Sequence, residues 1–286
     1  MHRIRLHILA FALFSCLASG QAIDNDKVWR EFIAWLQTQE SNRPPAEEYK
    51  AKLIADGFTE AQADERVALI GKLYEETPEF RQAASNAGFN KLYRTQDTQT
   101  RFTLKPNAFL VSVLRNLKPG KALDVAMGQG RNAVYVASQG WDVTGYDPAE
   151  EALKAAAANA ARAGVKITAV NATFDSFDYG KEKWDLIYFI YTDAPTMDAA
   201  FIARIKDALK PGGLVLLDRP FRSLKNPEPG WPETAQDKPN AHLKAWGDFH
   251  ILFYQDTEDE YADWQQTAAP RLEEKRRIVR FLARKM

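Results

Sequence analysis

The chain has 286 residues, a length that suits one large domain or one domain with an extension. Of these residues, 45% are hydrophobic and 27% are charged, as in an ordinary globular protein. Its 38 basic residues equal its 38 acidic ones, so charge gives no indication of a nucleic-acid partner. The apolar run near the N-terminus, Ile8–Ala18, is too short for a membrane span, which takes about 20 residues.

The first twenty residues have the layout of a secretory signal peptide. Arg3 and Arg5 give a basic start, Ile8–Ala18 is apolar, and Ala18-Ser19-Gly20 supplies small residues at cleavage spacing. We therefore predict removal of residues 1–20 and export to the periplasm or medium. The alternative is a buried N-terminal helix on a cytoplasmic protein. The only cysteine, Cys16, lies inside this segment, so the mature chain would form no disulfide.

Residues 21–104 are predicted to form a helical N-terminal extension. Apolar residues recur at helical spacing from Val28 to Leu36, and Pro44-Pro45 ends that helix and opens the next. Gly57 fits a helix end, and Thr59–Gln62 forms a capping box for a third helix. No cluster of catalytic residue types occurs here, which favours a packing extension or a cap.

Short apolar runs alternate with helical stretches from residue 106 onward, which is typical of βαβ units in a mostly parallel sheet. Strands are predicted at 121–126, 141–146, 166–170, 184–190, 213–218, 249–255 and 277–283. Helices are predicted at 107–117, 131–139, 148–163 and 196–209. The expected fold is a Rossmann-like α/β domain over residues 105–286.

The segment Leu123–Asn132 is predicted to be a turn between a strand and a helix. Gly128 and Gly130 allow a ligand to approach the backbone, and the helix N-terminus offers N–H groups to a carboxylate or phosphate. Asp124 can accept hydrogen bonds from a ligand ammonium. Asp147 ends the next strand, where a carboxylate can bind both hydroxyls of a ribose.

Each of these features has a simpler alternative when taken alone. The glycines with Ala133 resemble part of a nicotinamide-binding motif, or only a tight turn, and Asp147 suits the N-cap of the following Ala-rich helix. Their order and context together favour a nucleotide-type cofactor over a structural coincidence.

Three further segments resemble class I S-adenosylmethionine-dependent methyltransferases. Trp184–Tyr188 resembles their fourth strand, Leu209–Gly213 the turn into the fifth, and Arg277–Lys285 the last strand of an antiparallel terminal hairpin. The Gly128–Asn132 turn is similar to that of small-molecule methyltransferases of the tellurite-resistance type. The resemblance implies a seven-stranded sheet, S-adenosylmethionine as cofactor and a small-molecule methyl acceptor.

The resemblance also implies roles for individual residues. Residues around the methionine part of the cofactor would be Asp124, Ala126, Gly128 and Gly130, with Ala126 replacing the glycine usual at that position. Asp147 would hold the ribose, Pro148 would lie against the adenine, and Asn171-Ala172 would stand where the family often has an acidic residue for the adenine amino group. Arg131 would reach the cofactor carboxylate, or else pack or face solvent.

The acceptor side follows the fourth strand, where Tyr191 is the first candidate for a pocket wall. Asp193 and His242 are candidates for acid–base roles, although methyl transfer from a sulfonium mainly needs positioning and desolvation. Residues 219–246 form an insertion whose Arg219, Phe221, Trp231 and His242 would cover the pocket, unless it is a surface excursion. No metal is expected.

Two other functions remain open on the sequence. A non-catalytic cofactor-binding or interaction protein is possible because fold does not fix function. A nicotinamide-dependent oxidoreductase would share the glycine turn, but the sequence has no Tyr-x-x-x-Lys after the fourth or fifth strand.

Overall fold

A computed structural model describes residues 24–40, 45–95, 102–221, 238–260 and 276–286. The sheet is mixed, with seven strands in the order β3-β2-β1-β4-β5-β7-β6. The first five are parallel, and β7 is antiparallel to both β5 and β6. This is the Rossmann-like sheet with an antiparallel C-terminal hairpin that the sequence predicted.

The strands are β1 (Lys121–Val125), β2 (Asp142–Asp147), β3 (Thr168–Asn171), β4 (Trp184–Ile190), β5 (Leu209–Phe221), β6 (His250–Glu260) and β7 (Arg276–Arg284). The helices of the α/β part are α6 (Ala108–Leu114), α7 (Arg131–Ser138), α8 (Glu150–Ala163), α9 (Ala199–Ala208) and α10 (Ala241–Ala245).

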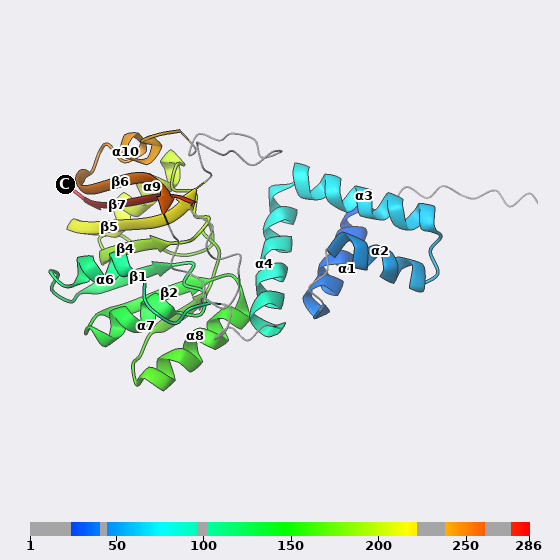
Figure 1. Cartoon of the computed structure of the whole chain (residues 1–286), viewed down its shortest axis with the longest axis horizontal. Coiled ribbons are helices and arrows are strands. Elements are labelled where there is room, and N and C mark those ends of the chain that lie inside the picture. Colours follow the sequence, from blue (N-terminus) through cyan, green and yellow to red (C-terminus); the bar gives the residue numbers. More distant parts are fainter. Residues whose placement is uncertain (1–23, 41–44, 96–101, 222–237, 261–275) are drawn as a thin grey trace, which may run out of the picture.

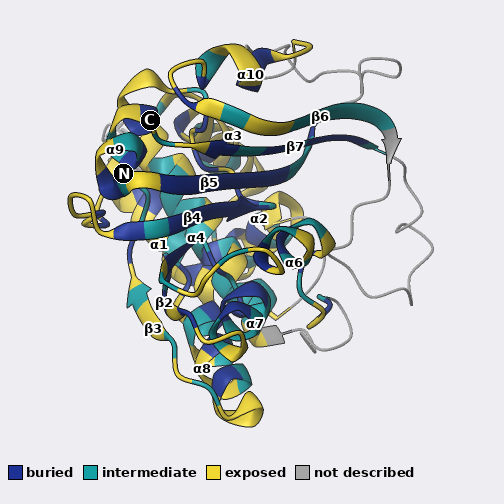
Figure 2. Ribbon diagram, turned by 90° about the vertical axis from the view of Figure 1, so that its left-hand side faces the viewer, coloured by how far each residue is buried: buried dark blue, intermediate teal, exposed yellow. Residues whose placement is uncertain are grey.

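Alternate residues of the central strands pack into two separate cores, one on each face of the sheet. Leu123 of β1 packs with Phe201 of α9 and with Trp246. Ala122, its neighbour, packs on the opposite face with Val136 of α7 and residues of α6 and α8. Figure 2 shows the resulting gradient, with β4, β5 and β7 mostly buried and the edge strand β3 mostly exposed.

Several element boundaries differ from the sequence prediction, and for three of them the contacts show the reason. Helix α8 begins at Glu150 and not at 148, because Asp147 Oδ1 accepts the Ala149 N–H at 2.9 Å and holds a turn there. Helix α9 begins at Ala199, since Asp198 caps it through the Phe201 N–H. Strand β5 continues to Phe221, so the start of the predicted 219–246 insertion is strand paired with β7.

Among the described residues, four helices precede the α/β part: α1 (Asn25–Thr38), α2 (Pro45–Ala55), α3 (Glu60–Glu76) and α4 (Pro78–Thr95). Pro45 opens α2, and the predicted capping box of α3 is present, with Thr59 and Gln62 hydrogen-bonded to each other's backbone N–H. These helices bury a core of their own, which includes Trp29, Tyr49 and Leu53.

Helix α4 lies between the other three helices and the α/β part (Figure 1). It packs against α8, so the N-terminal helices meet the α/β part at the helix that follows β2. Within the described part of the chain, no helix is long and apolar enough to cross a membrane.

Candidate functional site

The turn between β1 and α7 has an unusual backbone. Ala126, Gly128 and Gly130 have φ values of 54°, 55° and 75°, all in the left-handed region. At Gly130, a Cβ would lie 2.9 Å from the Ala156 Cβ, so a side chain there would push α8 away. The two glycines are therefore required, whereas Ala126 adopts this conformation with a methyl group in place.

Asp147, at the end of β2, joins this turn. Its Oδ2 accepts the Gly128 N–H at 2.9 Å while its Oδ1 accepts the Ala149 N–H at 2.9 Å. Burial raises the pKa of Asp147, and the two N–H groups partly counteract the rise. The carboxylate thus fixes the Gly128 backbone and the turn into α8 at the same time.

Asp124, in β1, is 2% exposed and lies under the first turn of α7. Burial raises its pKa to about 8, although the Tyr188 hydroxyl, Arg131 and the Ala133 N–H lower it in part. Its Oδ2 has no hydrogen-bond partner among the described residues. An orphaned, buried carboxyl oxygen beside a glycine turn is suited to accept a hydrogen bond from an ammonium group.

Asn171 ends β3 beside Asp147, with which it is in register. Its amide nitrogen donates to the Asp147 and Pro148 carbonyl oxygens at 3.3 and 3.1 Å. Ala172 is buried and also donates its N–H to the Asp147 oxygen, at 3.3 Å. The structure therefore brings these three residues and Asp147 together at the carboxyl ends of β2 and β3.

Arg131, the first residue of α7, bridges the turn and the end of β4. Its guanidinium donates to the Lys105 carbonyl at 3.0 Å and lies over the Tyr191 ring, 5.5 Å from its centroid. The Arg131 side chain is partly buried. Its contacts place one cation between the glycine turn and Tyr191.

Tyr191 directly follows β4 and has a φ of 54°. Its N–H donates to the Asp218 carbonyl of β5 at 3.0 Å, which holds the strained residue in place. Left-handed φ in a large residue is costly and is often found at functional sites. The role of Tyr191 as a pocket wall stays a prediction.

Asp193 and His242 lie in different environments. The Asp193 side chain is 87% exposed and ion-paired with Arg219 at 2.8 Å. His242 is 1% exposed, accepts or donates through Nε2 to Thr196 Oγ1 at 3.1 Å, and lies 5.0 Å from the Phe221 ring. Burial, with smaller contributions from Arg219 and Arg277, lowers the pKa of His242 to about 4.

These contacts give two groups near the carboxyl ends of β4 and β5. Arg219 links Asp193 to Phe221, over whose ring it lies at 4.9 Å, and Phe221 contacts His242. Tyr191 belongs with Arg131. Trp231, which the sequence placed in the same pocket, lies outside the described residues.

Several polar residues of this region were not found from sequence. Tyr188 is fully buried, and its hydroxyl faces Asp124. The alternation of side chains along a strand does not show whether such a residue lines a pocket or belongs to the core. Asp218 accepts from Asn107 at 2.9 Å and from Arg280 at 3.2 Å, contacts that join residues distant in the chain. No local pattern signals them.

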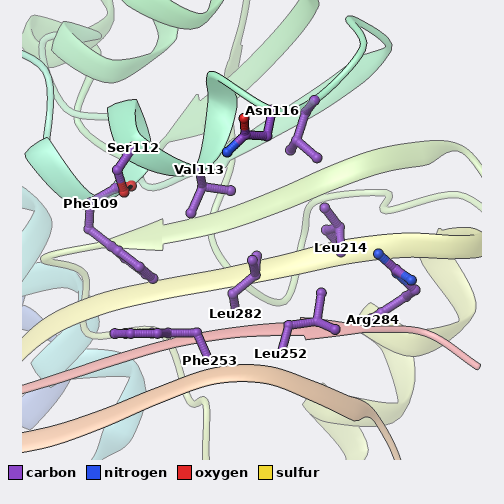
Figure 3. A pocket seen from close by; sticks show the side chains of 10 residues that line it. Phe109, Ser112, Val113, Asn116, Leu214, Leu252, Phe253, Leu282 and Arg284 are labelled. Carbon is purple, nitrogen blue, oxygen red and sulfur yellow. Dashed lines mark hydrogen bonds between the residues drawn. The ribbon is translucent and has the colours of Figure 1, made fainter.

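A separate hollow of about 400 Å³ lies between α6 and strands β5 to β7 (Figure 3). Its wall is mainly apolar, with Phe109, Leu252 and Phe253 among the lining residues and Arg284 at one side. None of the candidate site residues lines it, so it is distinct from the site at the glycine turn.

Comparison with known proteins agrees with this geometry. Residues 122–213 match the family model described as a methyltransferase domain. A curated relative, an uncharacterized methyltransferase of Synechocystis sp., is 32% identical over 126 residues, which are 42% of this chain and 55% of the relative. The match thus spans only about half the length of that relative.

Two solved structures share the fold. TehB from Haemophilus influenzae aligns with a TM-score of 0.52 at 20% identity, covering 70% of this chain and 67% of TehB. A structure reported for the conversion of a disulfide bond into a thioacetal group during echinomycin biosynthesis aligns with a TM-score of 0.53 at 16% identity, covering 69% and 90%.

Residues 122–213 are therefore similar to a methyltransferase domain, in agreement with the class I S-adenosylmethionine-dependent methyltransferases that the sequence resembles. The cofactor of this class is S-adenosylmethionine. The residues present fit that group, because the glycine turn, the orphaned Asp124 oxygen and the Asp147 carboxylate stand at adjacent strand ends.

Proposed function

We propose that this protein transfers the methyl group of S-adenosylmethionine to a small-molecule acceptor. The observation that carries the proposal is the buried Asp124 carboxyl, whose Oδ2 lacks a hydrogen-bond partner among the described residues and lies at the base of the Gly128–Gly130 turn. A buried polar atom of this kind usually has a partner, and the cofactor ammonium supplies one.

The other cofactor residues follow from their positions. Asp147 holds the ribose, Pro148 lies against the adenine, and Asn171, followed by Ala172 in the same loop, offers its amide oxygen to the adenine amino group. The Asn171 nitrogen is fixed on the Asp147 and Pro148 carbonyls, which leaves its Oδ1 for this role. Arg131 stands at the carboxylate end.

The cofactor supplies an electrophilic methyl group on a sulfonium. This chain positions and desolvates the acceptor, which enters beside Tyr191 at the carboxyl end of β4. His242 is uncharged at neutral pH because its pKa is about 4, and its Nδ1 has no partner among the described residues. It serves as a hydrogen-bonding group of the pocket, and Asp193 with Arg219 forms the rim.

Calorimetry with the purified protein tests the cofactor assignment. We expect S-adenosylhomocysteine to bind at micromolar concentration or tighter and NAD not to bind. Binding of NAD alone would identify the oxidoreductase alternative. Binding of S-adenosylhomocysteine without consumption of labelled methyl donor, across a broad set of thiol, amine and hydroxyl acceptors, would identify the non-catalytic alternative.

We further propose that residues 1–20 are removed on export, that residues 21–104 form the extension, and that residues 105–286 form the methyltransferase domain. The basic start, the short apolar run and the small residues at 18–20 support the first part. Residues 1–23 lie outside the described part of the chain. Mass spectrometry of the protein from its native host tests the cleavage, and a product beginning at Met1 or His2 would disprove it.

A further inference from the structure

Helix α4 of the N-terminal extension reaches the cofactor turn. A Cβ built on Gly128 would lie only 2.6 Å from the hydroxyl oxygen of Tyr93. The Cβ position of Gly128 therefore faces a side chain from the N-terminal helices. No role for Tyr93 was predicted from the sequence.

The position of Tyr93 is fixed by contacts on one side of α4. Asn90, one turn earlier, accepts the Glu151 N–H at 3.1 Å and so caps the start of α8. The Tyr93 ring lies 5.7 Å from that of Phe102, centroid to centroid. Gln129, the residue after Gly128, holds the same Phe102 by donating to its carbonyl at 3.3 Å.

The chemistry at the Tyr93 hydroxyl is that of a ligand-binding group. Burial and then the nearby Asp147 raise the pKa of the Tyr93 phenol, and the Gln129 backbone N–H counteracts them only in part, so the phenol keeps its proton. That proton is then available to an acceptor at the glycine turn. The turn leads into the N-terminus of α7, where the helix dipole and Arg131 both favour an anion.

We propose that Tyr93 is a cofactor-binding residue, which donates a hydrogen bond to the carboxylate of the S-adenosylmethionine amino-acid part. The N-terminal helices thereby complete the cofactor site. This inference rests on the proposed function, because it concerns the same site.

The test compares two ligands on the full-length protein and its Tyr93→Phe variant by calorimetry. Loss of one hydrogen bond to a carboxylate should weaken S-adenosylhomocysteine binding about 10- to 100-fold. Binding of 5′-methylthioadenosine, which has no amino-acid part, should be unchanged. The matched control is Tyr74→Phe on α3, whose side chain is exposed and should affect neither ligand.

Hydrogen exchange on the wild-type protein gives a second readout. S-adenosylhomocysteine should slow amide exchange in α4, and 5′-methylthioadenosine should do so less. The assignment would be overturned if the variant bound S-adenosylhomocysteine as tightly as the wild type, or if amide exchange in α4 did not change. Tighter binding by the variant would also overturn it and would mean that Tyr93 blocks the site. Absence of S-adenosylhomocysteine binding to wild-type protein would instead refute the proposed function and this inference with it.

Discussion

The hydroxyl of Tyr188 faces the carboxyl of Asp124 across the β1–β4 pair, where the two residues are partners in register and both are buried. Burial outweighs the favourable contacts and gives Asp124 a pKa of about 8. A carboxyl that is largely protonated at neutral pH has two measurable consequences.

The first consequence concerns binding. Asp124 must be ionised to accept a charged hydrogen bond from the cofactor ammonium, so binding below its pKa of about 8 releases a proton. We expect the affinity for S-adenosylhomocysteine to rise by less than about tenfold per pH unit between about pH 6 and 8. Above about pH 8 the affinity should no longer change. Calorimetry in buffers of different ionisation enthalpy measures both the affinity and the released proton. In Asp124→Asn this dependence should disappear; its persistence would assign it to another group.

The second consequence concerns stability. The folded pKa of Asp124, about 8, lies above its ordinary value of 3.8, so the folded protein holds a proton that the unfolded chain releases. The contribution of this group to the free energy of unfolding is therefore full at low pH and is lost as pH rises toward 8. The free energy of unfolding, measured by urea titration, should therefore depend differently on pH in the wild type and in Asp124→Asn over that range. Parallel curves would show that Asp124 has an ordinary pKa.

Ala126 offers a stabilising substitution. Its φ of 54° is the left-handed conformation, which costs a residue with a Cβ about 1–2 kcal/mol. Because glycine also has the more flexible unfolded state, Ala126→Gly should gain a net of at most about 1 kcal/mol. The control, Ala133→Gly inside α7, should lose at least about 1 kcal/mol. A destabilised Ala126→Gly protein would mean that the methyl group makes contacts worth more than the strain.

Arg277 and Asp256 form a buried bidentate pair, with nitrogen–oxygen distances of 2.6 and 2.7 Å. Arg277→Met leaves the Asp256 carboxylate without its cation, which should cost about 3–5 kcal/mol of unfolding free energy in urea titrations. Arg204→Met, whose partner Asp175 is 91% exposed, should change stability by less than about 1 kcal/mol. Equal effects of the two variants would refute the buried pair.

His242 should titrate far below a normal histidine. Its pKa of about 4 lies under its ordinary value of 6.5, so acidification protonates the unfolded chain first. The stability that His242 contributes is full above about pH 6.5 and is lost as pH falls toward 4. NMR titration of the imidazole, assigned by its loss in His242→Gln, should give a midpoint near 4. A midpoint above 6 would place His242 in contact with water or an anion.

Local signals predicted much of this structure. The capping box at Thr59 and the alternation of strands and helices after residue 106 depend on neighbouring residues, so they can be read directly. The Asp124–Gly130 turn was predictable because its residue types are needed at a strand end. The element boundaries were less so, since the Asp147 turn and the extension of β5 depend on contacts made only in the folded sheet.

The contacts between distant segments were out of reach. Tyr93 lies in a helix with little apolar asymmetry to show which face packs, and its contact with Gly128 depends on how α4 meets α8. The exposure of Asp193 and the burial of His242 likewise follow from the path of the chain around β5. A single sequence marks such residues as polar but does not say which partner each one meets.

The position of β7 between β5 and β6 constrains the order of folding. Strands β1 to β5 can pair as soon as they are synthesised, but one edge of β5 stays open until residues 276–284 arrive. β5 is among the most buried strands, so its apolar edge is exposed to other nascent chains throughout that interval. Truncation within β7 would therefore leave an aggregation-prone sheet edge. Pairing of β7 with β5 removes that edge once the chain is complete.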